Sequence, residues 1–181
     1  MQELPTIATE RLLLRPFTLD DAADVQRLAG DQAVADTTLS IPHPYPDGAA
    51  EQWISSHAER FESHEIMTLA VTLRDGGELA GCISLRLNDA HGRAELGYWM
   101  GVPYWNRGYC SEAARALVAY GFEQMGLHRV YAYHFVRNPA SGRVMQKAGM
   151  TYEGTLRQHA KKRERYEDLA AYGILRSENA T

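Results

Sequence analysis

The segment WNRGYCSEAA, residues 105–114, places a glycine-centred basic turn directly before the start of an amphipathic helix, and the strand-like run AELGYWM, residues 94–100, precedes it. Glycine lets the backbone curl without a Cβ clash. The N–H groups of the first helical turn are then left unpaired at the positive end of the helix dipole. This order of strand, glycine turn and helix start predicts a cradle for a phosphate or pyrophosphate, with the backbone N–H groups of residues 107–111 as donors.

The cradle is followed by a second strand and a second helix. The run RVYAYHF, residues 129–135, is rich in β-forming residues, and NPAS, residues 138–141, opens a short helix. Asn138 is a good N-cap, Pro139 a good first helical residue, and Gly149 a good terminator, so the sequence predicts a helix over 139–148.

These motifs resemble the acyl-CoA-binding motifs of the GNAT superfamily of N-acetyltransferases. The matching positions are Arg107-Gly108-Tyr109, Ser111-Glu112-Ala113, Asn138, Ser141, Lys147, Gly149 and Met150. The segments TERLLLRP, residues 9–16, and YEDLAAY, residues 166–172, further resemble the branch that includes the ribosomal-protein alanine N-acetyltransferases. The resemblance covers nearly the whole chain and implies a GNAT-like acyl-CoA N-acyltransferase fold.

Three positions depart from the superfamily pattern. Trp105 stands where Gln or Arg usually opens the phosphate motif, and Cys110 stands where Gly or Ala usually closes it. The backbone donors survive both changes, although Cys110 leaves less clearance. Met145 occupies the position, seven residues after Asn138, at which many members carry a general-acid tyrosine.

The composition is that of an ordinary globular protein. With 181 residues, 45% hydrophobic and 23% charged, the chain is expected to form a single domain over residues 1–181. A net charge of -4 argues against nonspecific binding of nucleic acid. We expect a cytoplasmic protein without membrane contact, because there is no apolar run of the required ~18–20 residues and no signal segment. Cys82 and Cys110 predict neither a disulfide framework nor a metal site.

Periodicity predicts a mixed α+β fold, with a mostly antiparallel sheet flanked by helices. Apolar residues recur along the helix predicted over 111–125 with the spacing of one buried stripe. The remaining elements are read from capping residues, alternation and glycine turns. The other expected helices cover 18–30 and 49–62, and the expected strands cover 11–16, 67–73, 78–87, 94–100, 129–135, 151–157 and 169–175.

Acetyl transfer from a thioester to an amine requires a bound cofactor, an unprotonated amine, a site for the oxyanion and support for the departing thiolate. The resemblance implies that the strand carrying Met100, Gly101 and Val102 splays from its neighbour. Its backbone would then pair with the pantetheine arm of acetyl-CoA, and one N–H would face the thioester oxygen. Arg107 could add a charge-assisted contact to the pyrophosphate, or it could be a solvated surface arginine.

Glu95 is the candidate general base. Alternation places it on the face of its strand opposite Leu96 and Tyr98, so that one face would be core and the other cleft. A glutamate on a solvated strand face is the alternative. Asp168, expected to begin the last strand, and Glu112, a first-turn acid that complements the helix dipole, are the other candidates.

Asn138 and Ser141 are candidates for contact with the cofactor. Capping alone explains Asn138, and the resemblance adds a hydrogen bond to cofactor or substrate. Ser141 matches a position beside the CoA sulfur in this branch. Because Met145 replaces the tyrosine, Ser141 becomes the candidate proton donor to the thiolate, directly or through water.

A basic run surrounds the turn between the last two strands and is either solvated or a rim that attracts an acidic substrate. Its members are Arg157, Lys161, Lys162, Arg163 and Arg165. The proline-rich segment 42–46 is either the opposite rim or a simple connection.

The function predicted from the sequence is transfer of acetyl from acetyl-CoA to a primary amine, with a protein N-terminal amino group as the preferred acceptor. An α-amine has a pKa of ~8 against ~10.4 for a lysine side chain, so a weak water-relayed base suffices for the former. Acetylation of a small-molecule amine and a non-catalytic acyl-CoA sensor are the alternatives, and a homodimer is left open. No metal is required.

Overall fold

The computed structural model describes residues 3–179, which contain one sheet of eight strands in the order β1-β2-β3-β4-β5-β6-β8-β7. Neighbouring strands are antiparallel except β5 and β6, which are parallel. The mixed, mostly antiparallel sheet confirms the predicted α+β class. The strands are β1 Ile7–Ala8, β2 Leu12–Arg15, β3 Ile66–Leu73, β4 Leu79–Asn88, β5 Arg93–Met100, β6 Arg129–Phe135, β7 Thr151–Lys162 and β8 Arg165–Leu175.

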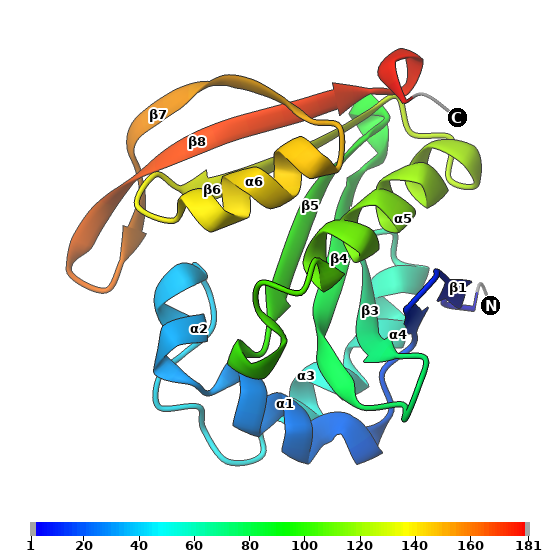
Figure 1. Cartoon of the computed structure of the whole chain (residues 1–181), viewed down its shortest axis with the longest axis vertical. Helices are drawn as coiled ribbons and strands as arrows, with labels where there is room; N and C mark the ends of the chain where they lie inside the picture. Colours follow the sequence, from blue (N-terminus) through cyan, green and yellow to red (C-terminus); the bar gives the residue numbers. More distant parts are fainter. Residues whose placement is uncertain (1–2, 180–181) are drawn as a thin grey trace.

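Helices cover both faces of the sheet (Figure 1). Two of them, α5 and α6, lie over one face, whereas α1, α3 and α4 lie on the opposite face. The helices are α1 Ala22–Ala29, α2 Gln32–Thr37, α3 Ala49–Ser55, α4 His57–Glu62, α5 Tyr109–Glu123 and α6 Pro139–Lys147. Within residues 3–179, no helix is long and apolar enough to cross a membrane.

Several element boundaries differ from the prediction. The single helix expected over 49–62 is two helices, because the hydroxyl and the N–H of Ser56 both donate to the carbonyl of Trp53, at 2.7 and 3.2 Å. The helix α2 was not predicted, although Asp31 caps it by accepting from Ala33 N at 2.8 Å. Strands β7 and β8 are longer than expected, so Asp168 lies inside β8 and does not begin it.

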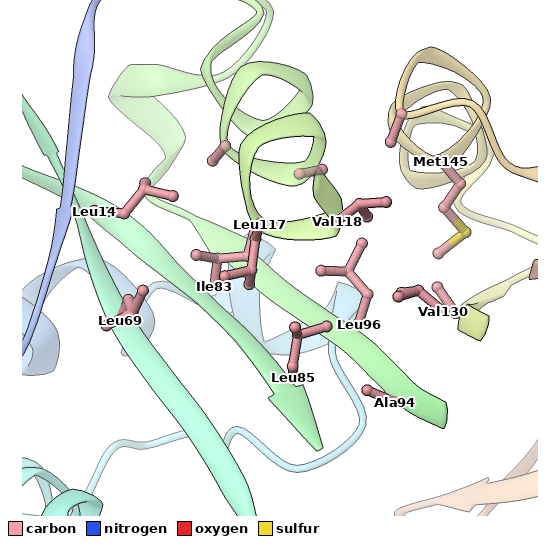
Figure 2. Close-up of a cluster of buried hydrophobic side chains, with 14 of the residues drawn as sticks. Leu14, Leu69, Ile83, Leu85, Ala94, Leu96, Leu117, Val118, Val130 and Met145 are labelled. Atoms are coloured by element: carbon pink, nitrogen blue, oxygen red, sulfur yellow. The ribbon is translucent and has the colours of Figure 1, made fainter. Parts of the chain in front are cut away.

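The buried stripe predicted for α5 is present and fixes this helix against the sheet. Figure 2 shows Leu117 and Val118 packed over side chains of β4 and β5, among them Ile83 and Leu96. Each of these four side chains is at most 2% exposed. Burial of one such aliphatic side chain contributes about 2 kcal/mol, so the packing anchors α5 on the sheet beside β4 and β5.

The parallel strands β5 and β6 pair over three positions only, Arg93 with Arg129, Ala94 with Val130 and Glu95 with Tyr131. Beyond this point β6 follows β8 along its whole length, and β5 continues alongside β4. The two strands therefore diverge after Glu95 (Figure 1). This divergence opens the middle of the sheet and positions the site.

Candidate active site

The turn before α5 has the geometry of an anion cradle. Gly108 is the N-cap with φ +81°, and the first helical hydrogen bond runs from Glu112 N to the Gly108 carbonyl at 3.0 Å. The N–H groups of residues 109–111 have no hydrogen-bond partner among the described residues. They are therefore free to bind phosphate oxygens at the positive end of the helix dipole.

Arg11 and Glu112 clamp this turn from the side, a function that the sequence did not reveal. The buried carboxylate of Glu112 accepts from Thr9 Oγ1 at 2.6 Å, from Arg11 N at 2.8 Å and from Arg11 Nε at 2.7 Å. Arg11 also donates to the Arg107 carbonyl at 3.0 Å and covers the Tyr109 ring at 4.8 Å. Burial alone raises the pKa of Glu112, but these hydrogen bonds outweigh it and lower the pKa below its usual value. Glu112 is thus a structural carboxylate.

A cavity of about 340 Å³ lies beside the cradle, between the end of β5 and the helices α5 and α6. We refer to it as the donor cavity. Seven of the residues predicted from the sequence line it, namely Met100, Gly108, Tyr109, Cys110, Ser111, Asn138 and Ser141. Burial raises the pKa of the Cys110 thiol to about 12, so this side chain stays neutral.

Gly101, Val102 and Arg107 are not among the residues that line the donor cavity. The N–H of Gly101 donates to the Ala80 carbonyl at 2.9 Å, so it is unavailable to a pantetheine arm, contrary to the expectation for this residue. Because backbone groups alternate along a strand, the N–H groups of Tyr98 and Met100 face the open side towards β6 instead. Val102 and Arg107 are exposed to solvent.

Trp105, one of the departures from the superfamily pattern, ties the cradle to β5. Its indole Nε1 donates to the Met100 carbonyl at 2.7 Å. The bond ties the connection between β5 and α5 back onto the end of β5. Tryptophan at this position therefore contributes a backbone anchor in place of the usual Gln or Arg.

A second cavity, of about 1120 Å³, lies on the opposite face of the sheet, and we refer to it as the acceptor cavity. Apolar and aromatic side chains dominate its walls. One side comes from the segment that carries Ile41, Pro42 and Tyr45, and the other from β7 with His159 and Lys161. Three residues of the proline-rich segment, Pro42, Tyr45 and Pro46, therefore line this cavity.

Glu95 lines the acceptor cavity at the point where β5 and β6 separate. Its carboxylate is half-buried and has no hydrogen-bond partner among the described residues. Burial raises the pKa of Glu95, and the nearby charge of Arg86 opposes this shift. A partly desolvated, unpaired carboxylate in a cleft is suited to accept a proton.

The two cavities meet beside the end of β5, where five residues line both of them, namely Thr37, Thr38, Tyr98, Trp99 and Ser141. The hydroxyl oxygen of Tyr98 lies 2.8 Å from Oγ of Ser141. Met145 is 1% exposed and points into the core beside Val130 (Figure 2), so it does not reach the gap. Tyr98 was identified from the sequence only as a neighbour of Leu96 on one strand face.

Asp168 is engaged elsewhere. The β7 strand bulges between Leu156 and Ala160, and Asp168 accepts the N–H of Gln158 in this bulge at 2.7 Å. The contact stabilises the positive φ of Gln158. Asp168 lines neither cavity, so its carboxylate is not placed to act as the general base. Nothing in residues 3–179 groups three or more metal-ligating His, Cys, Asp or Glu side chains.

Part of the basic run is structural and part faces the acceptor cavity. Lys162 is buried and donates to the Thr38 carbonyl, and Arg163 lies 3.7 Å from Asp36. These contacts fasten the β7–β8 hairpin to the segment around α2. Lys161, in contrast, lines the acceptor cavity.

Comparison with known proteins agrees with this geometry. Residues 11–151 match the model of the Acetyltransferase (GNAT) domain. The chain is 31% identical over 173 residues to Uncharacterized N-acetyltransferase YoaA of Bacillus subtilis (strain 168), covering 95% of this chain and 97% of that protein. It is 32% identical over 96 residues to the Ribosomal-protein-serine acetyltransferase of Escherichia coli (strain K12), covering 52% of this chain and 54% of the relative.

Solved structures show the same fold. A GNAT-family acetyltransferase from Bacillus anthracis superposes with a TM-score of 0.85 at 28% identity, covering 96% of this chain and 99% of the other. The spermidine N-acetyltransferase from Vibrio cholerae, solved with CoA and spermine, has a TM-score of 0.81 at 20% identity, covering 94% and 99%. The latter comparison shows the fold alone. The chain belongs to the GNAT family and is an acetyl-CoA-dependent N-acetyltransferase.

Proposed function

We propose that this enzyme acetylates the N-terminal amino group of a protein or peptide. The observation that carries the proposal is the acceptor cavity of about 1120 Å³ with Glu95 in its wall. Cavities for small ligands usually measure roughly 300–1000 Å³, so this one has room for an extended chain end rather than for a small amine alone. The relative from Escherichia coli, whose name specifies a ribosomal protein, supports the same class of acceptor.

The charges of the acceptor cavity disfavour a polyamine. Glu95 is the single carboxylate among the described residues that line it, whereas Arg60, Arg86 and Lys161 contribute cations. A polyamine carries additional ammonium groups that require anionic partners, and these partners are missing from the described walls. An N-terminal amine brings one positive charge and an otherwise neutral backbone, which matches one carboxylate.

In the proposed reaction, the cofactor lies on the donor side. The N–H groups of residues 109–111 bind the pyrophosphate, and the β5 backbone at Tyr98 and Met100 pairs with the pantetheine arm. One of these N–H groups stabilises the oxyanion, a contribution typically worth roughly 3 kcal/mol of the barrier. Glu95 takes the proton of the attacking amine from the acceptor side, directly or through one water, and the hydroxyl of Ser141 supports the departing thiolate.

The acceptor class is tested by incubating the enzyme with acetyl-CoA and a mixed panel. The panel contains peptides with free N-termini, the same peptides with acetylated termini and an internal lysine, spermidine, and small monoamines. Free-thiol release gives the rate and mass spectrometry gives the acetylated position. We expect peptides with free termini to give the highest kcat/KM.

Spermidine or a small monoamine as the best substrate would overturn the proposed acceptor while leaving the acetyltransferase activity intact. Tight CoA binding without thiol release for any member of the panel would favour an acyl-CoA sensor. The two failures are distinguishable, because thiol is still released in the first, whereas in the second CoA binds but no thiol is released.

A further inference from the structure

The hydroxyl of Tyr98 lies between two oxygen atoms of Ser141. The Tyr98 oxygen is 2.8 Å from Oγ and 3.1 Å from the carbonyl oxygen of Ser141. Tyr98 comes from β5, and Ser141 from the first turn of α6. The contact therefore joins β5 to α6 at the place where the donor and acceptor cavities meet.

The single hydrogen of the Tyr98 hydroxyl can be donated in two ways. The Ser141 carbonyl can only accept a hydrogen bond. In the first arrangement Tyr98 donates to this carbonyl, and Ser141 Oγ must then donate its own hydrogen to the Tyr98 oxygen. If Tyr98 donates to Oγ instead, the hydrogen of Ser141 is free to point elsewhere. The carbonyl then keeps the N–H of residue 145 as its donor, in the i to i+4 pattern of α6.

We propose that Tyr98 is a positioning residue, whose hydroxyl holds Oγ of Ser141 so that the Ser141 hydrogen points at the sulfur of acetyl-CoA. This inference rests on the proposed role of Ser141 in acetyl transfer. It gives a physical account of how the enzyme works with Met145 buried in the core, because a tyrosine hydroxyl from β5 orients the serine of α6 that faces the sulfur.

The step balances without a proton leaving Tyr98. The amine nitrogen attacks the thioester carbon, the C–N bond forms, and the C–S bond then breaks with its electron pair going to sulfur. The amine proton goes to Glu95, and the thiolate accepts a hydrogen bond from Ser141. A thiolate with a pKa of ~8.5 is a fair leaving group and needs no complete proton transfer. Burial raises the pKa of Tyr98 and keeps it a neutral donor.

A purely structural role for Tyr98 would consist of fastening α6 to β5. The two roles differ in how the loss of Tyr98 combines with the loss of Ser141. If Tyr98 acts through Ser141, removal of its hydroxyl has no further effect once Ser141 has gone. If it only fastens the helix, the two losses add.

The test is a double-mutant cycle with Tyr98→Phe, Ser141→Ala and the double variant, using acetyl-CoA and the best acceptor of the panel. We expect each single variant to lower kcat by roughly tenfold to a hundredfold, and the double variant to match Ser141→Ala. CoA affinity, measured by calorimetry, should stay within about twofold, because the proposed contact forms with the departing thiolate.

Tyr172→Phe is the matched control. Tyr172 is 7% exposed and accepts from Gln146 of α6 at 3.5 Å, so the variant also removes a hydroxyl contact to this helix, at a residue that lines neither cavity. Its turnover should change less than about twofold.

Unchanged turnover of Tyr98→Phe, or additive losses in the double variant, would overturn the positioning role while leaving the proposed function intact. A wild-type enzyme inert towards every acceptor would overturn both. If thermal denaturation shows that Tyr98→Phe does not fold, Tyr98→Met replaces it in the cycle, since it lacks the hydroxyl and fills the apolar surroundings.

Discussion

Glu95 of β5 and Tyr131 of β6 form the last pair of the parallel strands before these separate. The carboxylate of Glu95 is thereby held at the vertex of the opening, on the acceptor side, by a backbone that is paired on both edges. A base at this vertex is fixed relative to the gap through which an amine must reach the thioester. The strand pairing sets the position of Glu95 without requiring a hydrogen bond to its carboxylate.

We expect Glu95→Gln to lower kcat strongly while leaving CoA affinity nearly unchanged, because the proposed contact is with the amine and not with the cofactor. Turnover of the wild type should rise with pH through a pKa above the ordinary value for glutamate, since burial raises the pKa of Glu95. The deficit of the variant should be larger at low pH than at high pH, where the amine loses its proton unaided. Initial rates between pH 6 and 9 provide the measurement. Full activity of Glu95→Gln would assign the base role to bulk water.

The same substitution should not destabilise the fold at neutral pH. A folded-state pKa above the unfolded value means that the folded state binds the proton more tightly, so stability falls as the pH rises between the two values. Glu95→Gln removes this penalty, and its Tm at pH 7 should equal or exceed that of the wild type. Below the unfolded pKa of about 4.3 the two proteins should melt alike. A large drop in Tm at pH 7 would show that Glu95 has a structural partner.

Gly108→Val should weaken CoA binding by more than tenfold, about 1.4 kcal/mol. The φ of +81° is strained for a β-branched residue, and an added Cβ would lie 3.3 Å from Nη2 of Arg11. Gly126→Val is the control, because Gly126 has φ +69° with nothing within 4 Å of the added Cβ and lies at the other end of α5. Calorimetric titration with CoA compares the two variants. Equal affinities would mean that the cradle does not hold the pyrophosphate.

Glu112→Gln should destabilise the protein by about 2 kcal/mol and weaken CoA binding, since charge-assisted bonds to Thr9 and Arg11 are lost together. The hydrogen bonds lower the pKa of Glu112, so its contribution to stability is present above the unfolded pKa and is lost as the pH falls through the folded value. Urea unfolding at pH 7 and pH 3 should therefore show a large difference between variant and wild type only at pH 7. An equal difference at both pH values would contradict this assignment.

His57 should make the fold sensitive to mild acid. It is 3% exposed, packs edge-on against Trp53 at 4.4 Å, and has no hydrogen-bond partner for either ring nitrogen among the described residues. Burial, with a smaller contribution from Arg60, lowers its pKa to about 4. The unfolded state therefore binds the proton first, and stability falls as the pH drops from about 6.5 towards 4. His57→Phe should reduce the loss of Tm between pH 7 and 5, and the exposed His91→Phe should not.

The elements that can be predicted from sequence are those with local signals. The start of α6 at Pro139 and the buried stripe of α5 follow from local residue types and spacing, although the side chain of Asn138 makes no capping hydrogen bond. The break at Ser56 depends on a hydrogen bond from its hydroxyl to the carbonyl of Trp53, and the periodicity of apolar residues does not predict such a bond. The short helix α2 lacks an apolar period long enough to be recognised.

The parts of the site that are built from a short stretch of backbone could be predicted from the sequence. The parts that depend on contacts between residues far apart in the chain could not. The cradle around Gly108 is local, so glycine and helix start predict it. The pairing of Tyr98 with Ser141 joins positions 43 residues apart in the chain and requires the relative placement of β5 and α6. The bond from Gly101 to Ala80 depends on the register of β4 against β5, which shifts the available N–H groups to Tyr98 and Met100.

The two cavities open on opposite faces of the sheet and share few residues. Part of the acceptor side comes from the segment 39–46 and the β7–β8 hairpin, neither of which forms the cradle at α5. Substitutions in these parts of the acceptor cavity can therefore accumulate without changing the cradle that binds the cofactor. A lineage can drift towards a new recipient of the acetyl group by replacing loop and hairpin residues, with no simultaneous repair of cofactor binding. This separation makes the fold evolvable and explains why the phosphate turn says little about the recipient.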